Sequence, residues 1–234
     1  MAVNTDAYKK ILAECEAKHV QLVAVSKTKP VADIKELYDL GQRDFGENYV
    51  QELVEKQPQL PTDTRWHFIG HLQSNKVKYI TPFVHLIHGV DSLKLLQEIN
   101  KQAVKHNREA NCLLQVYIAQ EETKFGFDAN ELVVLFRDDL SELSKLANVR
   151  IFGLMGMASF TNEAEKVRGE YKYLKSLFDK YAQLPTANLP AGQAGSQLQT
   201  LSMGMSGDYQ IAIEEGSTMV RVGSLIFGER ASKP

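Results

Sequence analysis

The first residue of this sequence that could do chemistry is Lys27, which stands just after an apolar run. The run 22–25 contains only leucine, valine and alanine, so it reads as a short strand buried on both faces. Burial disfavours the charged form of an amine and lowers a lysine pKa from its ordinary value of about 10.4. A lysine made neutral in this way attacks carbonyl carbons and forms a Schiff base. The same stretch also fits two solvated loop cations, Lys27 and Lys29, and by itself it leaves both interpretations open.

A second group of candidate residues follows the last two strand-like segments of the chain. These residues are small or carry a hydroxyl group, and they are Gly204, Ser206, Gly207, Gly223 and Ser224. Barrel enzymes commonly bind a phosphate at this pair of loops, through backbone N–H groups and a helix N-terminus. We expect Ser206 to cap the helix that follows it, so that neighbouring amides face such an anion. A carbonyl-reactive lysine opposite a phosphate site suggests one ligand, pyridoxal phosphate.

The elements that must position these residues alternate between strand-like and helix-like patterns along the whole chain. The strand-like segments lie near residues 22–25, 44–48, 66–70, 84–90, 112–118, 149–155, 198–202 and 219–223, and a helical pattern or a short turn follows each one. Eight such units without a composition break predict a single α/β domain over residues 1–234, a closed (β/α)8 barrel of the TIM type. An open, doubly wound sheet is the alternative that the same alternation permits.

In a closed barrel the carboxyl ends of all strands meet at one mouth, where barrel enzymes carry their active sites. The polar residues that end the predicted strands are Lys27, Asn48, His71, Ser202, Ser206 and Arg221. We predict that Asn48 lines a pocket there, whereas His71 fits a pocket and a loop position equally well. His67, His85 and His88 lie inside predicted strands, and we interpret them as core or helix-facing residues rather than metal ligands.

Three helices have start signals that can be read from the sequence. Asp91, Asp128 and Thr161 each precede an apolar helical pattern and are predicted to begin a helix, Asp128 with Glu131 three residues later. Residues 184–197 are rich in proline, glycine and alanine. We predict that they form a mobile loop inserted into the barrel and not a domain boundary.

Composition and charge exclude several classes of protein. Hydrophobic residues make up 44% and charged residues 24%, which is ordinary for a globular protein with a real core. The formal net charge is −2, and no basic block suggests binding to nucleic acid or to a membrane surface. The N-terminus lacks the features of a signal peptide, and no apolar run approaches membrane-spanning length. Cys15 and Cys112 have no metal-binding or redox spacing, so we expect reduced core thiols in a cytoplasmic protein.

Five blocks of the sequence resemble the signatures of the pyridoxal phosphate homeostasis protein family. They are residues 22–30 (LVAVSKTKP), 45–52 (FGENYVQE), 66–76 (WHFIGHLQSNK), 201–206 (LSMGMS) and 216–230 (GSTMVRVGSLIFGER). The resemblance implies a single barrel similar to the N-terminal domain of alanine racemase. It also implies that the cofactor is held as an aldimine on the first lysine of the Ser-Lys-x-Lys-Pro motif, here Lys27. Lys29 is less suited to this role, because it lies beyond the strand at the helix entrance.

The same resemblance assigns further contacts to the cofactor. Arg221 would face the pyridine nitrogen, as an arginine does in the similar segment of the racemase. The residues implied for the phosphate are Gly223 and Ser224, through backbone donors, with Ser202, Met203 and Ser206. No metal is implied.

The expected activity follows from the residue at the pyridine nitrogen. An arginine is a permanent cation that keeps this nitrogen neutral, and it therefore disfavours carbanion chemistry. A racemase also needs a second acid/base residue, which in alanine racemase is a tyrosine from the C-terminal domain of the other subunit. We do not expect this chain to carry that domain, so we predict a monomer that stores, buffers or delivers pyridoxal phosphate, with apo pyridoxal-phosphate enzymes as recipients. A small amino-acid racemase is the alternative.

Overall fold

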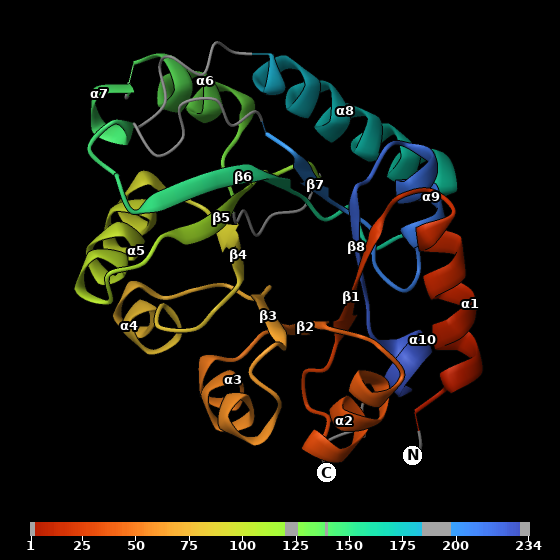
Figure 1. Cartoon of the computed structure of the whole chain (residues 1–234). Helices are drawn as coiled ribbons and strands as arrows, with labels where there is room; N and C mark the ends of the chain where they lie inside the picture. The colour runs from red at the N-terminus through yellow and green to blue at the C-terminus, as the bar shows by residue number, and fades with distance from the viewer. Residues whose placement is uncertain (1–2, 120–125, 139, 184–197, 230–234) are drawn as a thin grey trace.

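The computed structural model describes residues 3–119, 126–138, 140–183 and 198–229, and in it eight parallel strands close into a barrel (Figure 1). The strands are β1 (Gln21–Val25), β2 (Asp44–Glu47), β3 (Arg65–Phe68), β4 (Leu86–Val90), β5 (Ala110–Gln115), β6 (Val149–Met155), β7 (Thr200–Ser202) and β8 (Met219–Val222). Neighbouring strands follow the order of the chain, and β8 pairs with β1 to close the ring. The predicted barrel is confirmed, and the open sheet is wrong.

Helices between the strands form an outer layer around the barrel (Figure 1). They are α1 (Thr5–Glu16), α2 (Val31–Asp39), α3 (Val50–Lys56), α4 (Val77–Ile80), α5 (Leu93–Lys105), α6 (Ala129–Arg137), α7 (Leu140–Leu143), α8 (Ala164–Ala182), α9 (Tyr209–Glu214) and α10 (Ser224–Phe227). Two 3₁₀ turns, η1 (Gln57–Gln59) and η2 (Ser74–Lys76), precede β3 and α4. The amide of Asn4 donates to the carbonyl of Ile226 at 2.8 Å, which joins α1 to α10.

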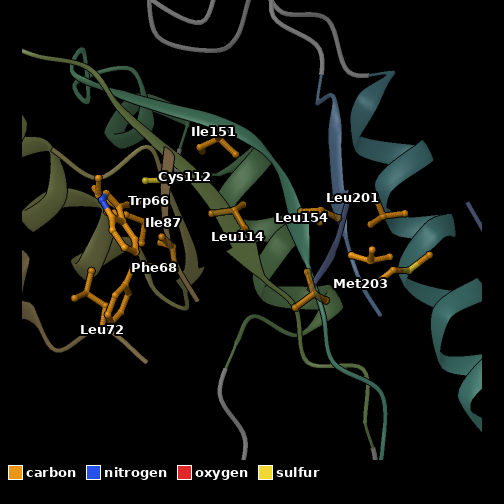
Figure 2. Close-up of a cluster of buried hydrophobic side chains, with 14 of the residues drawn as sticks. Trp66, Phe68, Leu72, Ile87, Cys112, Leu114, Ile151, Leu154, Leu201 and Met203 are labelled. Carbon is orange, nitrogen blue, oxygen red and sulfur yellow. The ribbon is translucent and has the colours of Figure 1, made fainter. Parts of the chain in front are cut away.

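Alternation of side chains along the strands divides the core into two layers. Leu22 and Ala24 of β1 pack among the helices, whereas Val23 between them lies in a separate cluster inside the barrel. Figure 2 shows part of the outer core, the layer between strands and helices, where buried side chains of several strands pack together. The inner apolar cluster contains Val23, Leu86, Leu113, Met155 and Met219. The interior is therefore a packed core and not a channel.

Two of the predicted helix starts are wrong by one to three residues. Ser92, not Asp91, is the N-cap of α5, because its hydroxyl accepts the amide of Leu95 at 3.3 Å. The helix α8 begins at Ala164 with Glu163 as its N-cap residue, and the Thr161 hydroxyl instead accepts the amide of Glu163 at 3.2 Å. At α5 a neighbouring polar residue makes the capping bond, whereas at α8 no side chain does.

The third start signal is confirmed. Asp128 and Glu131 form a capping box, in which each side chain accepts the other residue's backbone amide at 2.8 Å. Two helices, α6 and α7, follow this start. The predicted loop at residues 184–197 lies outside the described residues.

Two findings bear on the expectations drawn from composition. In the described part of the chain, no helix is both long enough and apolar enough to cross a membrane. Cys15 and Cys112 are both buried and neither forms a disulfide, as predicted. Burial raises the pKa of Cys15 to about 11, so this thiol stays protonated and behaves as a small apolar group.

The close pairing of β6 with β7 gives a test of the fold. A Cβ atom on Gly153 would lie 1.7 Å from the carbonyl oxygen of Thr200, so Gly153→Ala must push these strands apart. We expect this variant to lose about 2–4 kcal/mol of unfolding free energy in urea titrations. Gly169→Ala is the control, because a Cβ there meets no atom within 4 Å on α8. Gly169→Ala should gain about 0.5–1 kcal/mol of unfolding free energy from helix propensity. Equal stability of the two variants would contradict the register in which Gly153 pairs with Thr200.

Candidate functional site

The carboxyl ends of β2, β3 and β4 pack in direct contact at the mouth of the barrel. A Cβ on Gly70 would lie 2.3 Å from the carbonyl oxygen of Asn48, and one on Gly89 would lie 2.5 Å from that of Gly70. Only glycine permits approaches this close. The side-chain Oδ1 of Asn48 is buried and accepts no hydrogen bond in the described structure. Because a buried acceptor without a donor is costly, Oδ1 marks a point where a ligand hydroxyl could donate.

The segment that carries Lys27 out of β1 is held from one side by a buried ion pair. Ser26 Oγ donates to Glu47 Oε1 at 2.6 Å. Lys56 of α3 donates to that same oxygen and to the carbonyl oxygen of Ser26, both at 2.8 Å. Burial raises the pKa of Glu47, against the contacts from Lys56 and Ser26 that lower it. Since opening a buried pair leaves a charge without a partner, the backbone before Lys27 is firmly fixed.

The other side of Lys27 is held by Glu52. The amide of Thr28 donates to Glu52 Oε1 at 2.5 Å, and Lys56 Nζ donates to the same oxygen at 2.6 Å. Thr28 has a φ of 63°, in the left-handed region that a β-branched residue seldom adopts. The charged contact stabilises this strained turn, which redirects the chain into α2. Lys27 is partly buried. The cluster of Glu47, Glu52 and Lys56 holds the backbone on both sides of it, at Ser26 and at Thr28.

Lys29, the second lysine of the motif, has a structural role. Its ammonium donates to the carbonyl oxygens of Phe227, Gly228 and Glu229 at 2.6, 3.2 and 3.3 Å. These carbonyls lie at the end of α10, where a cation is favoured. Lys29 therefore ties α10 to the end of β1, as its predicted position at the helix entrance allows.

Arg221 on β8 is a buried cation close to the mouth. Its guanidinium donates to Ser202 Oγ at 2.6 Å and to the carbonyl oxygen of Gly156 at 3.1 Å. These contacts use two of its five N–H groups, and no other acceptor is found among the described residues. Burial lowers the pKa of Arg221, while Tyr171 and Asp208 raise it. The arginine remains protonated and has donors to spare for a ligand.

The loops after β7 and β8 bring Ser206, Gly223 and Ser224 together. Ser206 Oγ accepts the amide of Gly223 at 3.1 Å, and its own hydroxyl proton can still be donated. The predicted capping role of Ser206 is wrong, because α9 begins after Asp208, whose carboxylate accepts the amide of Met205 at 2.6 Å. The Ser224 amide begins α10 and has no acceptor among the described residues. Hydroxyl and amide donors thus meet where a phosphate was predicted.

Two further residues predicted for the phosphate, Ser202 and Met203, are fully buried. The amide of Met203 donates to the carbonyl of Met219 at 3.1 Å, and its side chain is buried in the outer core (Figure 2). The hydroxyl of Ser202 is fully buried inside the barrel, with Arg221 and His88 as partners. The two side chains therefore lie on opposite sides of the barrel wall, as alternation along an extended chain directs, and their role toward a phosphate stays a prediction.

His71 lies on the rim of the mouth, in the loop after β3. Its Nδ1 is 3.2 Å from Asp91 Oδ2, and nearly half of its side chain is exposed. This contact also explains why Asp91 is not the cap of α5. A role of His71 toward a ligand stays a prediction.

Sequence reasoning missed the residues that hold the site from behind, above all Glu47, Glu52 and Lys56. The i,i+4 spacing of Glu52 and Lys56 on a predicted helix was a readable signal. Such pairs are usually exposed, and only the packing of α3 against the end of β1 buries this lysine.

The fold and the residues at its mouth define a barrel of the alanine racemase type. The chain matches the family profile described as alanine racemase, N-terminal domain, over residues 3–231. The solved alanine racemase of Clostridium difficile 630 aligns with a TM-score of 0.72 at 18% identity, over 99% of this chain and 59% of that one. At this identity the likeness concerns the fold alone.

Relatives of higher identity narrow the assignment. The pyridoxal phosphate homeostasis protein of Aquifex aeolicus is 42% identical over 90% of this chain and 87% of its own length. The protein of the same name from Synechocystis is 37% identical over 97% and 99%. PipY of Synechococcus elongatus, solved with PLP bound, is 36% identical with a TM-score of 0.77, over 93% of this chain and 98% of that one. The chain belongs to the pyridoxal phosphate homeostasis protein family.

The cluster behind Lys27 leads to a prediction about Lys56. Lys56→Met leaves the buried Glu47 without its cation and should lower the free energy of unfolding by about 3–5 kcal/mol. Lys35→Met is the control, since Lys35 pairs with Asp39 at 3.0 Å on the exposed face of α2. That change should stay within about 0.5 kcal/mol. Urea titration of both variants measures the difference, and similar losses would mean that the buried cluster does not hold the segment.

Proposed function

We propose that this protein binds pyridoxal phosphate and takes part in its homeostasis, holding and releasing the cofactor and not turning over an amino acid. The observation that carries the proposal is family membership over nearly the whole chain. The relatives described above are named for this role, and PipY was solved with the cofactor bound. A buried arginine close to the mouth supports the same reading from the site itself.

The residues at the mouth fit the reactive end and the ring of the cofactor. Lys27, fixed on both sides by the Glu47–Lys56–Glu52 cluster, would supply the amine for the aldehyde. Arg221 has donors left over for a ring nitrogen that carries a lone pair. Asn48 has a buried oxygen that lacks a donor, which a ring hydroxyl would satisfy.

The phosphate would bind at the loops after β7 and β8. Ser206 can donate its hydroxyl proton and Ser224 offers its backbone amide, whereas the Gly223 amide donates to Ser206 Oγ and would have to be shared with the phosphate. Hydrogen bonds to a charged group are stronger than those between neutral groups, so these donors suit a dianion. We leave Ser202 and Met203 out of this set, and we keep His71 as a candidate on the rim.

Arg221 would limit the chemistry that the site could support. When bound, the cofactor supplies an electrophilic carbon and an electron-withdrawing ring. Because Arg221 only donates and stays charged, it would meet the ring nitrogen through a lone pair and keep that nitrogen unprotonated. An unprotonated ring withdraws electrons weakly, so chemistry that needs a well stabilised carbanion, such as transamination, is disfavoured. Racemisation would need a second acid/base residue besides Lys27. Amino-acid racemisation is the alternative.

We also infer how the protein works in its surroundings. It would act as a monomer in the cytoplasm and pass the cofactor to apo forms of pyridoxal-phosphate enzymes. Unpaired cysteines suit a reducing compartment. Exposed i,i+4 ion pairs, Lys35–Asp39 on α2 and Lys175–Asp179 on α8, make these outer helix faces polar and suit a monomer.

The assignment of Lys27 can be tested against its neighbour Lys29. Treating the loaded protein with borohydride should fix one cofactor per chain on Lys27, and peptide mapping by mass spectrometry should find it there. Lys27→Ala should abolish the fixed adduct. Lys29→Ala should keep it, with some loss of stability from the three lost carbonyl contacts. An adduct that maps to Lys29 would refute the assignment.

The proposed function is tested by comparing transfer with turnover. Loaded protein mixed with an apo pyridoxal-phosphate enzyme should restore that enzyme's activity, and free cofactor at equal concentration gives the reference. In heavy water with alanine, NMR should show no racemisation and little exchange at the α-carbon. Rapid exchange accompanied by racemisation would favour the racemase alternative, and failure to bind the cofactor at all would refute both readings.

A further inference from the structure

A chain of hydrogen bonds crosses the interior of the barrel and ends on Arg221. His67 Nε2 lies 2.9 Å from Asp44 Oδ1, and His67 Nδ1 lies 2.9 Å from His88 Nε2. His88 Nδ1 lies 3.2 Å from Ser202 Oγ, which accepts Arg221 at 2.6 Å. The five residues come from β2, β3, β4, β7 and β8, and all of them are buried. The sequence placed both histidines correctly in the core but gave no reason for their contact.

The chain has a direction that the chemistry of its members fixes. Asp44 is ionised and can only accept, so His67 Nε2 must carry the proton that it donates. A neutral His67 then accepts at Nδ1, and His88 must donate from Nε2. A neutral His88 in turn accepts at Nδ1, and the only donor there is the hydroxyl of Ser202. The Ser202 oxygen is left to accept from Arg221.

The opposite arrangement leaves a donor unsatisfied. If His67 were protonated, it would donate to His88, which would then donate from Nδ1 to Ser202. The Ser202 oxygen would accept from both His88 and Arg221, and its own proton would have no acceptor among the described residues. A buried donor without an acceptor is costly, so the neutral arrangement is the one that satisfies every group.

The charges around the chain agree with this arrangement. Burial alone would raise the pKa of Asp44, but hydrogen bonds from Arg65 and His67 outweigh it and hold that pKa below its ordinary value. Burial lowers the pKa of His88 well below its ordinary value, and the neighbouring His67 and Arg221 lower it further. The acceptor end of the chain is thus an anion, and the ring that contacts Ser202 is a neutral imidazole.

A metal ion is the competing explanation for these side chains. Ligand atoms of Asp44, His67 and His85 lie within 4.8 Å of one another. However, Arg65 donates to both carboxylate oxygens of Asp44, at 2.8 and 2.5 Å, so a cation already occupies that carboxylate. Both ring nitrogens of His67 also have partners within the chain. The hydrogen-bond chain uses each of these atoms, whereas a metal would have to displace Arg65.

We propose that Asp44, His67 and His88 are positioning residues that act through Ser202 to fix Arg221 for the ring of the ligand. Because His88 accepts the only proton of Ser202, the serine must present a lone pair to Arg221. That contact and the Gly156 carbonyl then set the plane of the guanidinium and the direction of its remaining donors. The proposal rests on the proposed binding of pyridoxal phosphate for its effect, but the chain itself belongs to the protein without any ligand.

The direction of the chain is tested first in the ligand-free protein. Long-range ¹H–¹⁵N NMR spectra at neutral pH should show His67 and His88 as neutral rings protonated at Nε2. An imidazolium, or a ring protonated at Nδ1, at either position would overturn the chain. Zinc titration is the second measurement. Binding of one zinc ion per chain that is lost in His67→Ala would support the metal explanation instead.

The effect on the ligand site is tested with a matched set of variants. His88→Leu removes the acceptor for Ser202 and should weaken pyridoxal phosphate binding about tenfold to a hundredfold, the range for one hydrogen bond to a charged group. The absorbance spectrum of the bound cofactor should shift, since Arg221 is no longer fixed. His88→Asn keeps an oxygen near the Nδ1 position, so it should recover much of the cofactor affinity and of the native absorbance spectrum. His85→Leu is the control, because the ring of His85 lies tilted beside that of His67, with 5.4 Å between their centroids, and does not join the chain.

The outcomes separate this proposal from the proposed function. If the native protein binds the cofactor and His88→Leu changes neither affinity nor spectrum, the positioning role is wrong. An equal loss in His85→Leu would reduce the effect to general packing and would also overturn it. If His88→Leu fails to fold, the positioning role is tested by the cofactor affinity of His88→Asn and by the histidine tautomers of the native protein. If the native protein does not bind the cofactor, the proposed function fails, and the NMR result alone decides whether the chain exists.

Discussion

The pairing of β1 with β8 is the contact on which the site depends. It closes the barrel, aligning Leu22 with Val220 and Val23 with Arg221. Lys27 and Arg221 lie almost two hundred residues apart in sequence, and this register alone brings the end of one strand beside the other. Gly223, directly after β8, completes the contact, since a Cβ there would lie 3.1 Å from the carbonyl oxygen of Val25.

Charges inside the barrel are stabilised in two different ways. Behind Lys27, the buried Lys56 meets carboxylates directly, and this compact cluster holds the backbone on both sides of Lys27. Arg221 has no direct carboxylate partner among the described residues. Its charge is met by a hydroxyl and a carbonyl, with Asp44 at the far end of a hydrogen-bonded chain. A buried cation whose donors are only partly used is poised for a ligand with a lone pair, whereas a fully paired one would be structural.

The comparison with alanine racemase separates fold from chemistry. Both chains share the barrel, yet at 18% identity the shared architecture leaves the activity undetermined. The family assignment comes from relatives around 40% identical over most of the chain. What the site does with a ligand therefore has to be argued from its own residues, as in the proposal above.

The sequence by itself determined the eight strand–helix units and marked the Lys27 motif and the donor-rich loops after the last two strands, because these follow from local periodicity and from residues next to one another. It also placed Ser202 and Met203 at the phosphate, which stays a prediction; it did not show that the Ser202 hydroxyl lies inside the barrel against Arg221 and that the Met203 side chain lies in the outer core. It could not find Lys56 or the contact between His67 and His88. Those depend on which faces of separate elements meet, and only tertiary packing decides whether a charged side chain is solvated or buried against a partner.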